Sequence, residues 1–191
     1  MKHKKSISGS KIKDLMYADL KRYGEVDMRS FLIAYFTNPG YKYVFYMRLS
    51  KYFKDMPLCF FLYVFCRMAL RHYKFKYGIE IPYCCNIGKG FCIGHFGTIV
   101  ISGETTIGEN CYILQGVTIG RGGRDGGSPV IGNNVDIYAG AKIIGNVKIG
   151  NNVRIGANAV VVKDIPDNSV VGAPLCNLIY MRNAKDVEDT K

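Results

Sequence analysis

Between Ile81 and Val161 an aliphatic residue returns every six positions, and this period is the strongest pattern in the chain. Isoleucine takes the repeating position almost throughout, and glycine follows it directly in seven of the repeats. A period of six matches neither the 3.6-residue repeat of an α-helix nor the alternation of an ordinary strand. It is typical of a solenoid in which short parallel strands stack an aliphatic ladder in the interior. The repeating positions are Ile81, Ile87, Ile93, Ile99, Ile101, Ile107, Ile113, Ile119, Ile131, Ile137, Ile143, Ile149, Ile155 and Val161.

Two interruptions break this period. The aliphatic position slips by two residues between Ile99 and Ile101. A longer break, Arg121–Pro129, replaces the aliphatic residue expected near position 125 and is rich in glycine. Because such a sequence cannot form a face of the coil, residues 121–129 are predicted to leave the solenoid as an excursion loop.

Residues 11–76 show a helical pattern instead, with apolar residues at three- and four-residue spacing. Breakers at 38–40 (NPG) and 56–57 (MP) divide this region into about three predicted helices. We therefore expect a mainly β protein in three parts. These are a basic, aromatic-rich helical domain (1–78), a parallel β-helix (79–175) and a C-terminal tail (176–191).

Charge is concentrated in the helical part. The chain carries a formal charge of +11, and residues 1–83 hold sixteen Lys/Arg against six Asp/Glu. Such a region suits nucleic acid, anionic lipid or an anionic substrate. No nucleic-acid-binding motif accompanies the charge, so solvated lysines around an aromatic core are the simpler interpretation. We expect no nucleic-acid partner and leave a peripheral contact with an anionic membrane open.

The remaining composition restricts the class of protein. The apolar run Leu58–Cys66 is far shorter than the ~20 residues needed to span a bilayer, and no signal peptide is recognised. Seven cysteines without C-x-x-C spacing predict reduced thiols in a cytoplasmic protein. The repeats offer a single histidine, whereas a zinc-dependent β-helix enzyme needs three. No metal is therefore expected.

His95 is the candidate catalytic residue. It lies between two glycines, just before the slip in the period, and a regular coil has no need of a histidine there. A neutral imidazole is the natural group to remove a proton from a hydroxyl near neutral pH. A carboxylate usually orients such a ring, and both Glu80, about one coil earlier, and Glu104 are candidates.

The excursion loop is the second candidate region. It carries Arg121, Arg124 and Asp125 among its glycines. Guanidinium groups and exposed backbone N–H groups suit an anionic ligand. From composition alone, a plain surface loop is an equal alternative.

Several strings of residues then point to a family. They are GHFGTIVISGE (94–104), ILQGVTIG (113–120), AGAKIIGN (139–146), VVVKDIP (160–166) and VGAP (171–174). With them, residues 80–179 resemble the hexapeptide-repeat acyltransferases, most closely the serine acetyltransferases. The resemblance implies a left-handed β-helix, acetyl-CoA as co-substrate, and a homotrimer or a dimer of trimers.

The resemblance also implies roles for individual residues. His95 matches the base that deprotonates the acceptor hydroxyl, and Glu80 stands where the family has the aspartate that pairs with it. The positions that match the coenzyme A groove are Gly122, Gly123, Ala139, Ala157 and Lys163.

Three departures from serine acetyltransferases concern the acceptor. Gly94 replaces an aspartate before the catalytic histidine, the excursion lacks the family's Asp-Arg-His-Pro sequence, and the chain ends in Lys191 instead of isoleucine. We then expect Glu104, Arg121 and Arg124 to bind the acceptor. These departures favour O-acetylation of a sugar hydroxyl in surface-polysaccharide synthesis. L-Serine O-acetylation for cysteine biosynthesis is the alternative, and a non-catalytic β-helix scaffold is an alternative of another class.

Overall fold

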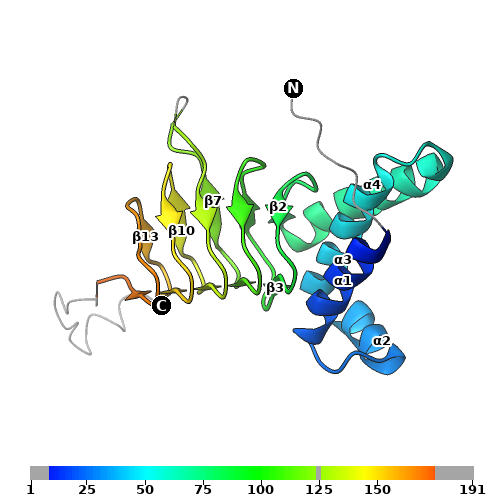
Figure 1. Ribbon diagram of the computed structural model, residues 1–191, viewed down its shortest axis with the longest axis horizontal. Coiled ribbons are helices and arrows are strands. Elements are labelled where there is room, and N and C mark those ends of the chain that lie inside the picture. Colours follow the sequence, from blue (N-terminus) through cyan, green and yellow to red (C-terminus); the bar gives the residue numbers. More distant parts are fainter. Residues whose placement is uncertain (1–8, 124–125, 175–191) are drawn as a thin grey trace, which may run out of the picture.

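The computed structural model describes residues 9–123 and 126–174 (Figure 1). Four α-helices come first: α1 (Gly9–Lys21), α2 (Met28–Thr37), α3 (Pro39–Phe53) and α4 (Phe60–Tyr77), with the 3₁₀ helix η1 (Pro57–Cys59) before α4. They pack at one end of a long stack of short strands. The predicted architecture, a parallel β-helix with an N-terminal helical region, is confirmed, and the β-helix has about five turns.

The helical region has one helix more than the sequence predicts. The missed boundary lies between Lys21 and Met28, where α1 ends and α2 begins. It contains neither proline nor a glycine pair. The signal at this boundary is the start of α2, where the Asp27 side chain accepts a hydrogen bond of 2.6 Å from the Ser30 N–H and caps the helix.

The strands form three parallel sheets that run the length of the stack. Sheet 1 contains β1 (Ile79–Glu80), β4 (Ile99–Ile101), β7 (Thr118–Gly120), β10 (Lys142–Ile144) and β13 (Val160–Val161). Sheet 2 contains β2 (Asn86–Ile87), β5 (Thr106–Ile107), β8 (Val130–Ile131) and β11 (Lys148–Ile149). Sheet 3 contains β3 (Cys92–Ile93), β6 (Tyr112–Ile113), β9 (Asp136–Ile137), β12 (Arg154–Ile155) and β14 (Val170–Val171).

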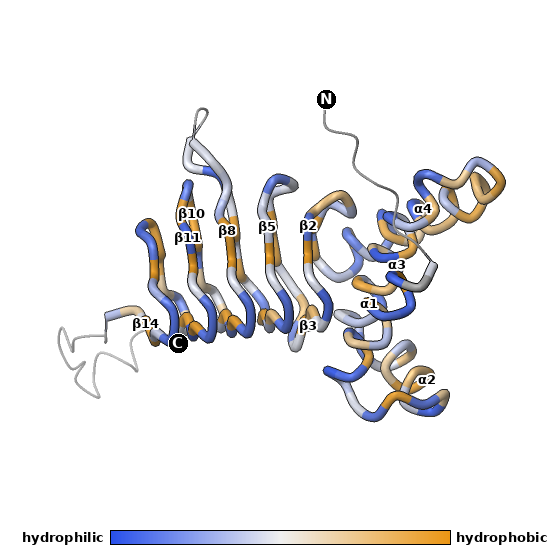
Figure 2. The backbone as a smooth tube through the Cα atoms, in the orientation of Figure 1, coloured by the Kyte–Doolittle hydropathy of each residue, from blue (hydrophilic) through white to orange (hydrophobic). Residues whose placement is uncertain are grey.

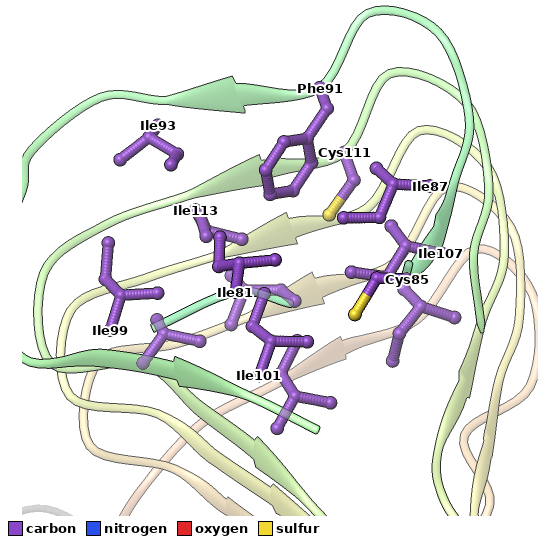
Figure 3. Packing of buried hydrophobic residues seen from close by; sticks show 14 of the residues in the cluster. Ile81, Cys85, Ile87, Phe91, Ile93, Ile99, Ile101, Ile107, Cys111 and Ile113 are labelled. Atoms are coloured by element: carbon purple, nitrogen blue, oxygen red, sulfur yellow. The ribbon is translucent and has the colours of Figure 1, made fainter. Parts of the chain in front are cut away.

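The aliphatic ladder of the sequence is the core of the solenoid. In sheet 3, for example, Ile93, Ile113, Ile137 and Ile155 stand in register on successive coils, and all four are fully buried. Near the helical end the interior also takes Phe91, Cys85 and Cys111, as Figure 3 shows. Because each coil buries its apolar residues only against its neighbours, the regular six-residue period is sufficient to specify this core.

Asparagines form the corner between sheets 2 and 3. Asn110, Asn134, Asn152 and Asn168 all have φ between 54° and 59°, a left-handed conformation that asparagine tolerates better than most residues. Each of the first three side-chain amides donates to the side-chain oxygen of the next, at 3.0, 3.0 and 2.9 Å. This ladder fixes the corner that lies away from the candidate active site.

A buried ion pair joins the helices to the first coil. Arg48 of α3 forms two hydrogen bonds to the Asp19 carboxylate of α1, at 2.9 and 3.2 Å. It also donates to the Ile87 and Gly88 carbonyls, while Asp19 accepts from the Phe91 N–H. The position of the helical region relative to the first coil is therefore set by specific polar contacts.

Candidate active site

His95 and Phe96 form a two-residue bulge in the corner between β3 and β4. The residues on either side of the bulge are both hydrogen-bonded to the next coil. The Gly94 N–H donates to a carbonyl of that coil at 3.0 Å, and the Gly97 carbonyl accepts from an N–H of that coil at 2.8 Å. In that next coil the two equivalent residues are neighbours in sequence, so the bulge accounts for the slip seen in the period. A bulge of this kind redirects a side chain away from the regular ladder.

The bulge places His95 on the surface. Its backbone turns back into the coil through Gly97 (φ 116°) and Thr98 (φ 48°). The ring of Phe96 packs edge-on against Tyr77 of α4, with ring centroids 5.5 Å apart. His95 itself is exposed and makes no hydrogen bond or ion pair within residues 9–123 and 126–174. Its imidazole is thus held beside the β-helix with both nitrogens available.

The bulge stands at the head of a column of corner residues, three of the four small. Gly97, Gln115, Ala139 and Ala157 take the same corner position on successive coils. The first three accept backbone hydrogen bonds of 2.8–2.9 Å from the coil that follows. The N–H groups of Ala139 and Ala157 find no acceptor in the described part of the chain. Predicted coenzyme-binding positions and the predicted base therefore share one edge of the solenoid.

Tyr112 lies beside the bulge and was not identified from the sequence. A Cβ atom placed on Gly94 would overlap the Tyr112 hydroxyl oxygen and the ring carbons next to it. Burial is the first cause that raises the pKa of this phenol, so it is a neutral donor at physiological pH. The tyrosine ring therefore takes the space beside position 94 that a side chain there would need. The sequence signal was a bulky aromatic at the outward position of a hexad.

The carboxylate of Glu80 does not bond to His95 in this chain. It accepts a hydrogen bond of 2.6 Å from the Lys74 ammonium group, and both side chains are more than one-third exposed. Glu80 pairs in register with Val100 of β4, so it lies on the outer face of sheet 1. It also lines a hollow of about 560 Å³ between α4 and the first coil, together with Arg67 and Arg71. The pairing of Glu80 with His95 stays a prediction.

Glu104, the other candidate partner of His95, belongs to a different cluster. It lies 3.4 Å from Arg121 and accepts a hydrogen bond from Ser128, also at 3.4 Å. Arg121 donates to the Gly126 carbonyl at 3.1 Å as well, across the base of the excursion. Strand β4 separates this cluster from the bulge, because His95 precedes the strand and Glu104 follows it. Arg124, the third predicted acceptor-binding residue, lies outside the described residues.

The other predicted coenzyme-binding residues line this second corner. Gly122 lies against Gly145 of the next coil, which bonds to the Gly120 carbonyl. Gly123 has φ 66° and no atom within 4 Å of the point where a Cβ would stand, so the surface there is open. Lys163 follows β13 at the same corner and is exposed. The structure thus divides the five predicted positions between the two edges of sheet 1.

Lys142 lies between these two edges and was missed in the sequence. It points outward from β10 and donates hydrogen bonds to the Gly116 carbonyl and to the Thr118 hydroxyl, the latter at 3.2 Å. Its ammonium group therefore joins two successive coils near the column that follows the bulge. Its position within a hexad gave no hint of this role.

Two cysteines near His95 in the sequence are unsuited to nucleophilic chemistry. Cys92 and Cys111 are buried, and burial raises the pKa of both thiols. A protonated, inaccessible thiol is a poor nucleophile. Among the described residues there is also no cluster of three His, Cys, Asp or Glu side chains placed to hold a metal ion.

Comparison with known proteins agrees with this geometry. A family model described as bacterial transferase hexapeptide (six repeats) matches residues 128–163. The chain is 33% identical over 162 residues to the serine acetyltransferase of Bacillus pumilus, which covers 83% of this chain and 72% of that enzyme. The chain belongs to the serine acetyltransferase family. The serine acetyltransferase of Staphylococcus epidermidis is 48% identical over 115 residues, or 59% of this chain and 54% of that protein.

Solved structures of the same family match most of the fold. Isoform 3 of serine acetyltransferase from Entamoeba histolytica, in complex with cysteine, has a TM-score of 0.73 at 26% identity and covers 94% of this chain. The enzyme from Neisseria gonorrhoeae in complex with serine has a TM-score of 0.70 at 28% identity. A serine acetyltransferase in complex with CoA has a TM-score of 0.69 at 25% identity. The last two each cover 86% of this chain. The chain spans 64% of the Entamoeba protein and 68% of the other two.

These findings correct the acceptor that the sequence favoured. The prediction of a sugar hydroxyl in surface-polysaccharide synthesis is wrong, because the relatives and structural neighbours are serine acetyltransferases. The departures that suggested a sugar are local. The space beside Gly94 is filled by Tyr112, and the shortened excursion still holds Arg121 against Glu104. The findings support an acetyltransferase and leave its acceptor to be proposed.

Proposed function

We propose that this chain transfers the acetyl group of acetyl-CoA to the hydroxyl of L-serine. The observation that carries the proposal is the placement of an exposed histidine at the head of the column that ends in Ala139 and Ala157. Family membership supports the same reaction, since the relatives are serine acetyltransferases. L-Serine was the alternative acceptor predicted from the sequence, and it now replaces the sugar.

His95 acts as the general base in this proposal. One imidazole nitrogen takes the proton of the serine hydroxyl as its oxygen attacks the thioester carbonyl carbon. The tetrahedral intermediate then collapses, the carbon–sulfur bond breaks, and the imidazolium returns the proton to the departing CoA thiolate. No acyl-enzyme is formed, which agrees with the burial of Cys92 and Cys111.

The column supplies the groups that a pantetheine chain needs. The N–H groups of Ala139 and Ala157 lack acceptors in the described chain, and small side chains leave the backbone accessible. An extended amide-bearing chain lying along this edge can accept from both. Lys163 is exposed at the other edge of sheet 1, where its charge suits the phosphates of the coenzyme.

Binding of a zwitterion requires one anionic and one cationic group. Glu104 and Arg121 lie 3.4 Å apart and provide such a pair, but β4 separates them from His95 of the same chain. We therefore propose that the site is completed across a subunit boundary, with the second corner of one subunit facing the bulge of its neighbour. A homotrimer, alone or as a dimer of trimers, satisfies this requirement.

A panel of acceptors tests the proposed function. Release of CoA thiol from acetyl-CoA should be stimulated by L-serine and not by glycerol, a nucleotide sugar or D-serine. Equal stimulation by every hydroxyl compound, or turnover with the nucleotide sugar alone, would contradict the proposal. The non-catalytic scaffold makes a different prediction, namely that CoA fails to raise the melting temperature of the protein.

A further inference from the structure

A stripe of apolar side chains runs along the outer face of η1 and α4. Leu58, Phe61, Phe65, Met68 and Phe75 follow one another at alternating three- and four-residue spacing, apart from one place taken by His72. The five apolar side chains are between 60% and 101% exposed in the isolated chain. Residues at this spacing lie on one face of a helix. We call these five residues the α4 stripe.

The opposite face of α4 is already used for packing. Cys66 and Leu70 are buried against α3 and the first coil, so the helix is apolar on both its inner and its outer side. Figure 2 shows the hydrophobic segment at the end of α4 that points away from the β-helix. Fold stability accounts for the inner side only, and an exposed apolar surface of this extent marks an interaction site.

The charges around the stripe identify the partner. Residues 57–77 contain four basic side chains, Arg67, Arg71, Lys74 and Lys76, and no Asp or Glu. Arg71 and Lys76 are exposed on this helix. An apolar face bordered by basic residues matches the boundary between the acyl chains and headgroups of an anionic bilayer. A second copy of the chain fits less well, because face-to-face contact would bring like charges together.

The helix can lie on such a bilayer but not cross it. Within residues 9–123 and 126–174, no helix is long and apolar enough to span a membrane. We infer that the α4 stripe docks the protein onto the surface of a membrane that contains anionic lipid. This inference is independent of the acceptor that the enzyme uses.

Vesicle sedimentation of the full-length protein tests the inference. The wild type should sediment with vesicles of equimolar phosphatidylglycerol and phosphatidylcholine, and much less with phosphatidylcholine alone. The double variant F61S/F65S should lower the partition coefficient for the anionic vesicles by roughly tenfold or more. The variant R71E/K76E should weaken binding to anionic vesicles only, and added salt should weaken the wild type in the same way.

The helix α2 provides the matched control. Leu32 and Phe36 are also exposed, but α2 lies at the other end of the helical region (Figure 1) and carries a single basic residue, Arg29. The variant L32S/F36S should bind vesicles as the wild type does. Thermal melts check that each variant is folded. If F61S/F65S fails to fold, the loss of binding to anionic vesicles in R71E/K76E still tests the inference.

Two results would overturn the inference. One is wild-type protein that stays in the supernatant with anionic vesicles, and the other is F61S/F65S that sediments as the wild type does. Light scattering adds to the first result, because it shows whether the mass of the assembly falls in F61S/F65S. A fall in mass without vesicle binding would assign the stripe to contact between copies of the chain.

Discussion

The hydroxyl oxygen of Tyr112 occupies the space in which a Cβ atom on Gly94 would stand. Gly94 immediately precedes His95, so this contact couples the sheet 3 side of the site to the residue proposed as base. It gives a physical reason for the glycine where serine acetyltransferases have an aspartate. The two positions are therefore expected to tolerate change only together.

Substitution at this pair should be non-additive. Gly94→Asp forces the tyrosine ring to move and is expected to lower the free energy of unfolding by about 1–3 kcal/mol, the usual cost of overpacking. Adding Tyr112→Ser should recover most of that loss, since it removes the obstructing ring. Urea unfolding of both single variants and the double variant measures the coupling. Additive effects would show that the ring does not restrict position 94.

The Asp19–Arg48 pair should be essential for attachment of the helices. Arg48→Met leaves a buried carboxylate without its partner and is expected to cost about 3–5 kcal/mol of stability. The double variant D19N/R48M should be less destabilised than R48M, because no unpaired charge remains. Equal destabilisation of R48M and the double variant would contradict this account of the pair.

The pH dependence of R48M gives a separate prediction. Burial is the largest influence on the Asp19 pKa and raises it from 3.8, while Arg48 acts to lower it. Loss of Arg48 therefore raises the pKa further, and the folded state holds its proton more tightly than the unfolded state. Stability then falls as pH rises from near the unfolded pKa through the folded pKa. The deficit of R48M relative to wild type should be smaller at about pH 5 than at about pH 8, and a constant deficit would contradict it.

The small residues of the column that begins at Gly97 should control coenzyme affinity. Ala157→Leu places a bulky side chain over the exposed backbone and is expected to raise KM for acetyl-CoA roughly tenfold, equivalent to about 1.4 kcal/mol of binding. Ala157→Gly keeps the N–H group and the open surface, so it serves as the matched control with near-normal KM. Steady-state kinetics at saturating L-serine compare the two variants. Similar KM values in both would place the coenzyme elsewhere.

Mixed assemblies test whether the site crosses a subunit boundary. His95→Ala and Glu104→Gln should each be inactive or nearly so as pure proteins. If one subunit supplies His95 and its neighbour supplies Glu104, co-expressed subunits should regain activity, because some boundaries carry both native residues. Failure to regain activity in verified mixed assemblies would place both groups within one subunit's site.

The fold was predictable because its determinant is local and repeated. Each aliphatic residue of the ladder contacts its equivalent one coil away, so the six-residue period alone specifies the interior. The boundary between α1 and α2 was missed because its signal is a single side-chain cap, Asp27 at the start of α2. Such a cap is a weaker signal than the prolines that mark the later breaks.

The site was only partly predictable for a different reason. His95 could be found because the bulge shifts the period, and the column could be found through the resemblance. The contacts of Tyr112 with Gly94 and of Lys142 with Gly116 depend on which residues stack on successive coils. Those separations change from 20 to 24 to 18 residues along sheet 3, as its paired positions show. A fixed repeat could not anticipate them.

The rate of CoA release by the His95→Ala variant tests the central claim most directly. With acetyl-CoA and L-serine at saturating concentrations, the wild type should turn over, and the variant should lose roughly 10²–10⁴-fold in kcat, the usual effect of removing a general base. Its melting temperature and its thermal shift with CoA should stay close to those of the wild type. A folded, CoA-binding His95→Ala protein that retained wild-type turnover of L-serine would contradict the account.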